Sequence, residues 1–223
     1  MSQRNTEAPA KPRRRTQAER SAATQERLLT ATVECLYELG YHKTTTYTVE
    51  QRAGVTRGAL LHHFASKHAL LVGAVAYMVE TAERQLVADT ATVAGKNVGE
   101  ELTDLLWRQF TSPTFVAFME ITMAARTDPA LREALAESQN RLDALCRTAA
   151  RNVAGHIDGG AIDDTTFGMG IELTIRYMRG AAGMLLLDDN AGGHDEIYRE
   201  WQRLVAPYFT GSVRKTRRTA PRD

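Results

Sequence analysis

The chain has 223 residues, of which 43% are apolar, enough to bury the core of one large domain or of a small and a medium domain. It contains no run of about 18 uncharged apolar residues, and no apolar stretch follows the basic N-terminus. We therefore predict neither a transmembrane helix nor a secretory signal, and we expect a cytoplasmic protein.

The net charge of +1 hides an uneven distribution along the chain. Residues 1–75 carry 11 Lys and Arg against 6 Asp and Glu, whereas residues 76–211 carry 12 against 20 and residues 212–223 carry 5 against 1. A basic front part and an acidic body suit a protein that meets phosphate at one end only. The alternative is a solvated charge distribution that serves no partner.

Residues 1–23 are rich in Pro, Ala, Gln and Arg without apolar periodicity, so we expect a disordered basic arm. Its run of three Arg residues, 13–15, could follow phosphates or enter a minor groove, or it could belong to a solvated tail that adds weak nonspecific attraction. Apolar residues recur at helical spacing from residue 24 to 39, and Gly40 is expected to end this supporting helix.

Residues 45–64 have the spacing of two short helices joined by a tight turn, which is a helix-turn-helix. Either Thr45 or Thr46 can cap the first helix, which runs to Ala53. Gly54 then supplies the left-handed backbone conformation that ends it, because a residue without Cβ adopts positive φ at little cost.

The second helix of the motif begins at once. Thr56 can cap it, and Val55 and Leu60 occupy the positions of a hydrophobic staple. The tight turn pushes the N-terminal half of this helix outward, where it fits a DNA major groove. Gly58 and Ala59 are poor choices for a merely solvated face but suit a face that another surface approaches closely. The alternative is an ordinary helical hairpin inside a bundle.

Residues 24–72 resemble the DNA-binding domain of the TetR/AcrR family of bacterial one-component transcription regulators. The most specific stretch is AGVTRGALLHHFASK, which fixes the register without gaps. The matching residues are Leu28, Leu29, Ala31, Gly40, Tyr41, Thr45, Val49, Ala53, Gly54, Val55, Thr56, Gly58, Leu60, His63, Phe64, Ser66, Lys67 and Leu70.

Ser66 is expected to cap a long helix that runs from Lys67 to about residue 93 and crosses from the basic part into the acidic part. In the family that the chain resembles, this helix transmits ligand binding to DNA. Further helices are expected over residues 97–111, 114–126, 130–153, 163–187 and 195–209, with turn residues only between them.

No segment alternates with period two, so we predict an all-α chain. Its expected parts are a disordered basic arm (1–23), a three-helix helix-turn-helix DNA-binding domain (24–70), a helical ligand-binding and dimerisation domain (71–210) and a basic tail (211–223).

Arg57 is the residue that we expect to read a base, guanine by preference, because Arg most often does so. The other residues of the predicted DNA-contacting surface are Thr45, Tyr47, Thr56, Gly58, Ala59, Leu61, His62, His63 and Lys67.

Three residues depart from the pattern of the family. Leu61 stands where a Tyr usually contacts DNA, so that contact is missing or is replaced by contact with a thymine methyl group. Glu50 replaces a small residue, and an acid near DNA could lower affinity. His68 replaces a Glu at the start of a helix, where a negative charge is favourable.

Aromatic and Met side chains crowd residues 107–123 and recur later, where they could surround an apolar ligand or fill an ordinary core. The candidate pocket residues are Trp107, Phe110, Phe115, Phe118, Met119, Met123, Tyr177 and Met178. Glu120, Glu172 and Arg176 are candidate polar groups, although Glu172 and Arg176 could simply pair on a helix surface. The expected effector is mostly apolar and roughly drug-sized.

Glycines in the middle of a predicted late helix cost stability unless two backbones pack closely. With their apolar neighbours they predict a four-helix interface between two copies of the chain, which the resemblance also implies; packing within one chain is the alternative. The candidate interface residues are Gly180, Ala181, Gly183, Met184, Leu187, Ile197, Trp201 and Leu204.

The sequence offers no catalytic constellation, metal-binding set or cofactor motif. The GMG at 168–170 lacks the third glycine of a dinucleotide site, and the adjacent His62 and His63 have no metal-binding spacing. Cys35 and Cys146 are interpreted as buried small side chains, with redox sensing as the alternative.

We therefore predict a ligand-responsive DNA-binding transcription regulator and not an enzyme. It is expected to be a repressor rather than an activator, to bind a near-palindromic operator as a homodimer, and to be released by a small effector. The alternative is a helical ligand-binding or scaffolding protein without specific DNA binding.

Overall fold

The computed structural model describes residues 16–91, 98–154, 164–186 and 191–210, and all regular secondary structure in these ranges is helical. This confirms the predicted all-α fold. The helices are α1 (Gln17–Lys43), α2 (Thr46–Ala53), α3 (Arg57–His63), α4 (Lys67–Thr90), α5 (Val98–Phe110), α6 (Pro113–Ala125), α7 (Pro129–Ala154), α8 (Asp164–Leu185) and α9 (Ala191–Thr210).

Helix α1 begins earlier than the sequence pattern predicted. The backbone N–H of Glu19 donates to Thr16 Oγ1 (3.2 Å), and the N–H of Thr16 donates to the Glu19 carboxylate (2.7 Å), which makes a capping box. The expectation of disorder was therefore wrong for residues 17–23. A strong cap followed by good helix formers outweighs the lack of apolar periodicity there. Residues 1–15 lie outside the described part.

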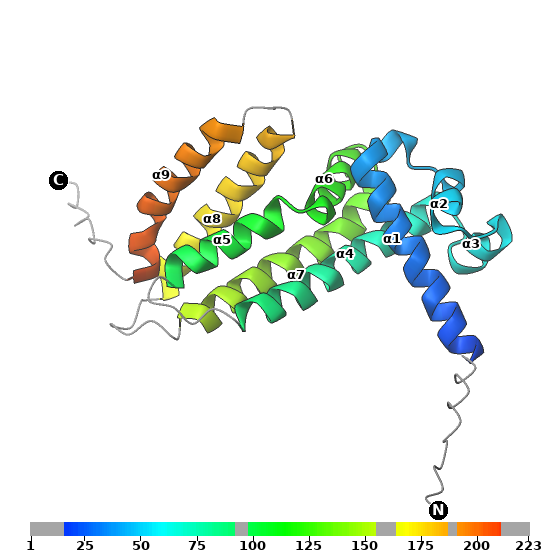
Figure 1. Ribbon diagram of the computed structural model, residues 1–223, viewed down its shortest axis with the longest axis horizontal. Helices are drawn as coiled ribbons and strands as arrows, with labels where there is room; N and C mark the ends of the chain where they lie inside the picture. The colour runs from blue at the N-terminus through cyan, green and yellow to red at the C-terminus, as the bar shows by residue number, and fades with distance from the viewer. Residues whose placement is uncertain (1–15, 92–97, 155–163, 187–190, 211–223) are drawn as a thin grey trace, which may run out of the picture.

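The helices form an elongated molecule with a small domain at one end (Figure 1). Helices α1, α2 and α3 make this end, together with the first turn of α4. Helices α4 and α7 pack side by side through the middle, and α5, α8 and α9 lie at the opposite end. Besides α4 itself, the contact between α1 and α6 connects the small domain to the larger one.

The buried apolar side chains form two clusters. Leu28, Val49, Leu60 and Leu70 belong to the cluster of the small domain. Leu71 belongs to the second cluster, which extends through the later helices. Adjacent residues of α4 thus pack into different cores, so one continuous helix is part of both domains.

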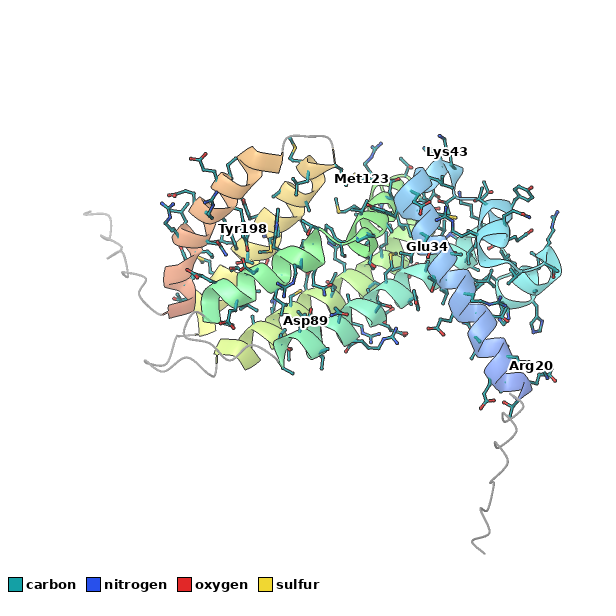
Figure 2. The ribbon with its side chains drawn as sticks, in the orientation of Figure 1. Arg20, Glu34, Lys43, Asp89, Met123 and Tyr198 are labelled. Carbon is teal, nitrogen blue, oxygen red and sulfur yellow. The ribbon has the colours of Figure 1, made fainter. Side chains whose placement is uncertain are left out.

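Four stacked aromatic rings tie α5, α8 and α9 together at the far end. Trp107 of α5 stacks on Tyr198 of α9 (5.0 Å between ring centroids), Tyr198 on Trp201 (5.8 Å), and Trp201 on Tyr177 of α8 (4.7 Å). The Tyr198 hydroxyl also donates to Asp104 of α5 (2.8 Å; Tyr198 is labelled in Figure 2). We call these four rings the aromatic stack.

Candidate nucleic-acid interface and internal cavity

Local residues cap both ends of the first helix of the motif, α2. Thr45 caps α2, because the N–H of Thr48 donates to Thr45 Oγ1 (3.1 Å) and the N–H of Thr45 donates back to Thr48 Oγ1 (2.8 Å). Gly54 takes the left-handed conformation (φ 62°, ψ 42°), and the N–H of Val55 reaches back to the carbonyl of Glu50 (3.2 Å). This bond pattern is a Schellman ending, and the left-handed conformation of Gly54 is the one that the sequence predicted.

The second helix follows after a turn of only three residues. The N–H of Ala59 donates to the hydroxyl of the cap, Thr56 (3.2 Å). Leu60 is fully buried against the small-domain core, whereas Arg57 and Gly58 are exposed. The exposed side of α3 therefore begins at its N-terminus, and it carries the guanidinium group that we expected to read a base.

The other residues of the predicted DNA-contacting surface lie mostly on this outer side. Tyr47 of α2 is 66% exposed and Leu61 of α3 is 47% exposed. Thr45, Thr56 and His62 are exposed, and Ala59, His63 and Lys67 are half-buried. A Cβ built on Gly58 would meet no atom within 4 Å, so packing inside the chain does not require a glycine there.

Two features fix the motif onto its supporting helices. Arg52 of α2 forms ion pairs with Glu38 (2.5 Å) and Glu34 (3.7 Å) of α1, and the guanidinium beside Glu38 lowers the pKa of that carboxyl. Gly73 of α4 lets the ring of Phe64 approach, because a Cβ at this position would lie 2.8 Å from the ring. Gly73 was not predicted from the sequence, because the helical pattern of residues 67–90 does not show which side chain packs against a glycine.

The structure changes the interpretation of three residues of the motif. Glu50 is only 8% exposed, so its side chain belongs to the interior of the small domain and not to the outer face where we expected it to disfavour DNA. The Lys67 ammonium donates to the carbonyl of Tyr41 (3.3 Å) and lies 4.6 Å from the Tyr41 ring centroid, and burial lowers its pKa. His68 lies with Nδ1 4.0 Å from the carboxylate of Asp128.

The larger domain holds an apolar cavity between α4, α5, α6 and α7. Its free volume is about 40 Å³, and its lining is apolar except for Gln109, Ser112 and Thr114. The residues that line it are Met78, Val79, Ala82, Leu86, Leu106, Gln109, Phe110, Ser112, Thr114, Phe115, Phe118, Leu142 and Cys146. Drug-sized ligands occupy pockets of about 300 Å³ or more, so the expected effector does not fit the cavity as it stands.

Only three of the predicted pocket residues, Phe110, Phe115 and Phe118, line this cavity. Met123 is 62% exposed, on the outer side of α6 (labelled in Figure 2). Trp107 and Tyr177 are part of the aromatic stack, Met178 is fully buried in the core and Met119 is half-buried against it. These five residues do not line the cavity, because composition cannot tell on which side of a helix a side chain lies, and their part in ligand binding stays a prediction.

The three candidate polar groups also lie outside the cavity lining. Arg176 pairs with Glu172 on the surface of α8 (3.0 Å), and Arg147 of α7 pairs with the same carboxylate. The Glu120 carboxylate accepts the backbone N–H of Tyr41 (2.8 Å), at the end of α1. Glu172 and Arg176 therefore pair on the helix surface, which was the alternative given above.

The outer faces of α8 and α9 carry large apolar side chains. Met184 and Ile197 are 59% and 60% exposed, and Leu204 is 67% exposed. Gly180 is exposed, Ala181, Gly183 and Trp201 are half-buried, and Leu187 lies outside the described residues. A Cβ on Gly180 or Gly183 would meet nothing within 4 Å, so neither glycine serves packing inside this chain.

The described residues contain no group of three or more His, Cys, Asp and Glu side chains that could hold a metal ion. None of the helices in the same ranges is long and apolar enough to cross a membrane.

Comparisons with known proteins agree with this geometry. The family model described as bacterial regulatory proteins, tetR family, matches residues 28–74. The HTH-type transcriptional regulator CymR of Pseudomonas putida is 34% identical over 131 residues, which are 58% of this chain and 64% of CymR. An uncharacterized HTH-type transcriptional regulator of Mycobacterium tuberculosis H37Rv is 33% identical over 174 residues, which are 75% of this chain and 85% of that protein.

The fold is also shared with solved structures. The crystal structure of a TetR transcription regulator from Haloarcula marismortui has a TM-score of 0.58 at 18% identity and covers 86% of this chain and 98% of that one. The helix-turn-helix and these relatives together define a DNA-binding transcription regulator, not an enzyme. The chain belongs to the TetR family of bacterial regulators.

Proposed function

We propose that this regulator is a repressor that binds a near-palindromic operator as a homodimer and leaves it when a small apolar effector binds. The observation that carries the proposal is the exposed side of α3. It offers Arg57, a bare glycine backbone and the exposed Leu61 on one side of a helix whose other side is fixed by the fully buried Leu60. A helix with this exposure suits a major groove, where Arg can bind guanine with two hydrogen bonds.

The apolar outer faces of α8 and α9 support the homodimer. They expose Met184, Ile197 and Leu204, and the open space over Gly180 and Gly183 would let a second backbone approach. In such a dimer each copy contributes one α3. The two α3 helices would enter successive major grooves about 34 Å apart, which is one turn of DNA, or a modestly larger distance apart. The operator would then be near-palindromic, because its halves are read by identical subunits.

The cavity supports release by an effector. Helix α4 starts in the small domain and lines the cavity with Met78, Val79, Ala82 and Leu86. Since only about 40 Å³ is free, an effector of ordinary size would have to part α4 from α6 and α7, and this change would reach the small domain along α4. The effector can weaken DNA binding only by as much as it prefers the opened state.

Repression rather than activation is favoured by the names of relatives. Several similar regulators are named as transcriptional repressors, among them AcnR of Corynebacterium diphtheriae. We therefore expect the operator to lie near the promoter that the regulator controls.

The proposal is tested by footprinting the protein on the DNA that flanks its own gene, at physiological salt, with random DNA as competitor. We expect a protected site of two related half-sites. If no fragment there is bound more tightly than random DNA, a helical ligand-binding or scaffolding role without specific DNA binding becomes the better interpretation.

Arg57→Ala should reduce the preference for the protected site over random DNA by about tenfold to a hundredfold, because one bidentate base contact is worth about 1–3 kcal/mol. Lys43→Ala is the matched control. Lys43 is exposed at the end of α1, next to the cap of α2. Its loss should weaken binding to the protected site and to random DNA equally, and it should lower the slope of log affinity against log salt concentration by about 1. An equal loss of preference in both variants would contradict the role of Arg57.

A further inference from the structure

The backbone around Tyr41 joins the two domains through hydrogen bonds. Its N–H donates to Oε2 of Glu120 on α6 (2.8 Å), and its carbonyl accepts from the ammonium of Lys67, the first residue of α4 (3.3 Å). We call these three residues the Tyr41 junction. Glu120 reaches it across the domain boundary, from 79 residues further along the chain.

Gly40 makes room for this contact. Its backbone (φ 76°, ψ 172°) interrupts the helical geometry of α1 in a region that is essentially restricted to glycine. A Cβ there would lie 3.2 Å from Oε2 of Glu120. The break in α1 thus turns the Tyr41 N–H away from the helical ladder and offers it to α6.

The junction leads directly into the DNA-binding motif. The N–H and the hydroxyl of Thr44 both donate to the carbonyl of Gly40 (3.2 and 2.8 Å), which closes residues 40–44 into a tight turn. The next residue, Thr45, is the cap of α2. A displacement of Tyr41 would therefore be passed to α2 through one short, hydrogen-bonded turn.

Both helices that hold Tyr41 also line the cavity. Helix α6 contributes Phe115 and Phe118 to the lining and, two residues further on, Glu120 to the junction. Helix α4 contributes Lys67 to the junction and Met78 to the lining. Parting these helices from within the cavity would move the two groups that fix Tyr41.

We propose that Glu120 is a positioning residue for DNA binding. Its hydrogen bond to the Tyr41 backbone fixes the position of the helix-turn-helix domain and couples that position to whether the cavity is filled. This inference rests on the proposed function. It adds a second route beside α4, from the cavity through α6 and Glu120 to the end of α1.

The test measures affinity for the footprinted site in Glu120→Ala and Glu120→Gln. Glu120→Ala removes the acceptor and should weaken operator binding by about tenfold, the size of effect expected from losing one hydrogen bond to a charged group. Glu120→Gln keeps an amide oxygen in place and should bind within about threefold of the wild type. Thr122→Ala, also on α6, loses only a bond to the carbonyl of Phe118 and should bind like the wild type.

A cavity-filling substitution takes the place of the unidentified effector. Cys146→Phe puts a ring into about 40 Å³ of free space and should part the surrounding helices, and Cys146→Met is the milder variant if the first does not fold. Filling should weaken operator binding in the wild-type background but add little in the Glu120→Ala background, because both changes act on the same junction. Equal losses in the two backgrounds, or wild-type affinity of Glu120→Ala, would overturn the proposal.

Hydrogen exchange tests the junction without DNA. In Glu120→Ala the peptides that cover α2 and α3 should exchange faster, while those that cover α7 keep their wild-type rates. Unchanged exchange of α2 and α3 would overturn the role of Glu120. A wild-type protein that binds no flanking DNA specifically would instead count against the proposed function, so the two failures are distinguishable.

Discussion

Gly73 shows how one missing side chain sets the distance between a helix and the motif that it supports. A Cβ there would lie 2.8 Å from the ring of Phe64 and 3.3 Å from a methyl group of Leu29, both buried. We expect Gly73→Ala to lower the free energy of unfolding by about 1–3 kcal/mol, the cost of overpacking a filled core. Urea denaturation followed by circular dichroism measures it.

Gly58→Ala is the matched control for this change. The site lies in α3 and has open space around it, so the added methyl group should leave stability unchanged or raise it by up to about 1 kcal/mol. Equal stabilities of Gly73→Ala and the wild type would show that Phe64 can move aside without loss.

The two cysteines should be unreactive in the folded protein. Burial raises the pKa of Cys146 to about 12 and also raises the pKa of Cys35. The thiolate is the reactive form, and a raised pKa keeps each thiol protonated at pH 8. We expect no reaction with a disulfide reagent such as DTNB in the native state and reaction of both thiols in urea. Rapid reaction of one thiol per chain with DTNB in the native protein would contradict this expectation.

Local conformation at single residues could be predicted from the sequence, whereas distant partners could not. Gly54 was predicted correctly because a left-handed helix ending depends only on the residues beside it. The partner of Glu120 lies 79 residues away and that of Lys67 lies 26 residues away. No spacing rule relates such pairs, so the sequence could mark Glu120 as a polar residue among apolar ones but could not say what it binds.

At the scale of helices, the predicted ends are close to the observed ones where a cap marks them. Ser66 and Ser112-Pro113 show this, because both serines accept the N–H that a cap should accept. The start of α1 was predicted too late in the chain, because a capping box can begin a helix where no apolar spacing marks it. The side of each helix that faces the cavity was the least predictable feature, as Met123 shows.

The docking of α9 on α5 depends on a polar contact beside the aromatic stack. The Tyr198 hydroxyl donates to Asp104, and burial raises the pKa of Tyr198. Tyr198→Phe keeps the ring but removes the donor, and we expect it to lower the free energy of unfolding by about 1–3 kcal/mol. Thermal unfolding by calorimetry measures the loss. Tyr47→Phe, at an exposed ring in the small domain, should show none.

At the scale of the whole molecule, the apolar faces of α8 and α9 should decide the oligomeric state. We expect light scattering to give twice the 24.7 kDa of one chain, and Leu204→Glu to reduce the mass to that of a monomer, because a buried unpaired charge opposes association. Met123→Glu alters a side chain of similar exposure on α6 and should leave the dimer intact. A dimer that survives Leu204→Glu would place the interface elsewhere.

The aromatic stack has a practical consequence for spectroscopy. Trp107 and Trp201 are the only tryptophans of the chain, and both belong to the stack, at the end of the molecule opposite α3 (Figure 1). Intrinsic tryptophan emission therefore has no source in the DNA-binding domain. A change in emission when operator DNA is added would report a rearrangement carried through the length of the protein, so the native chain holds its own optical probe of long-range communication.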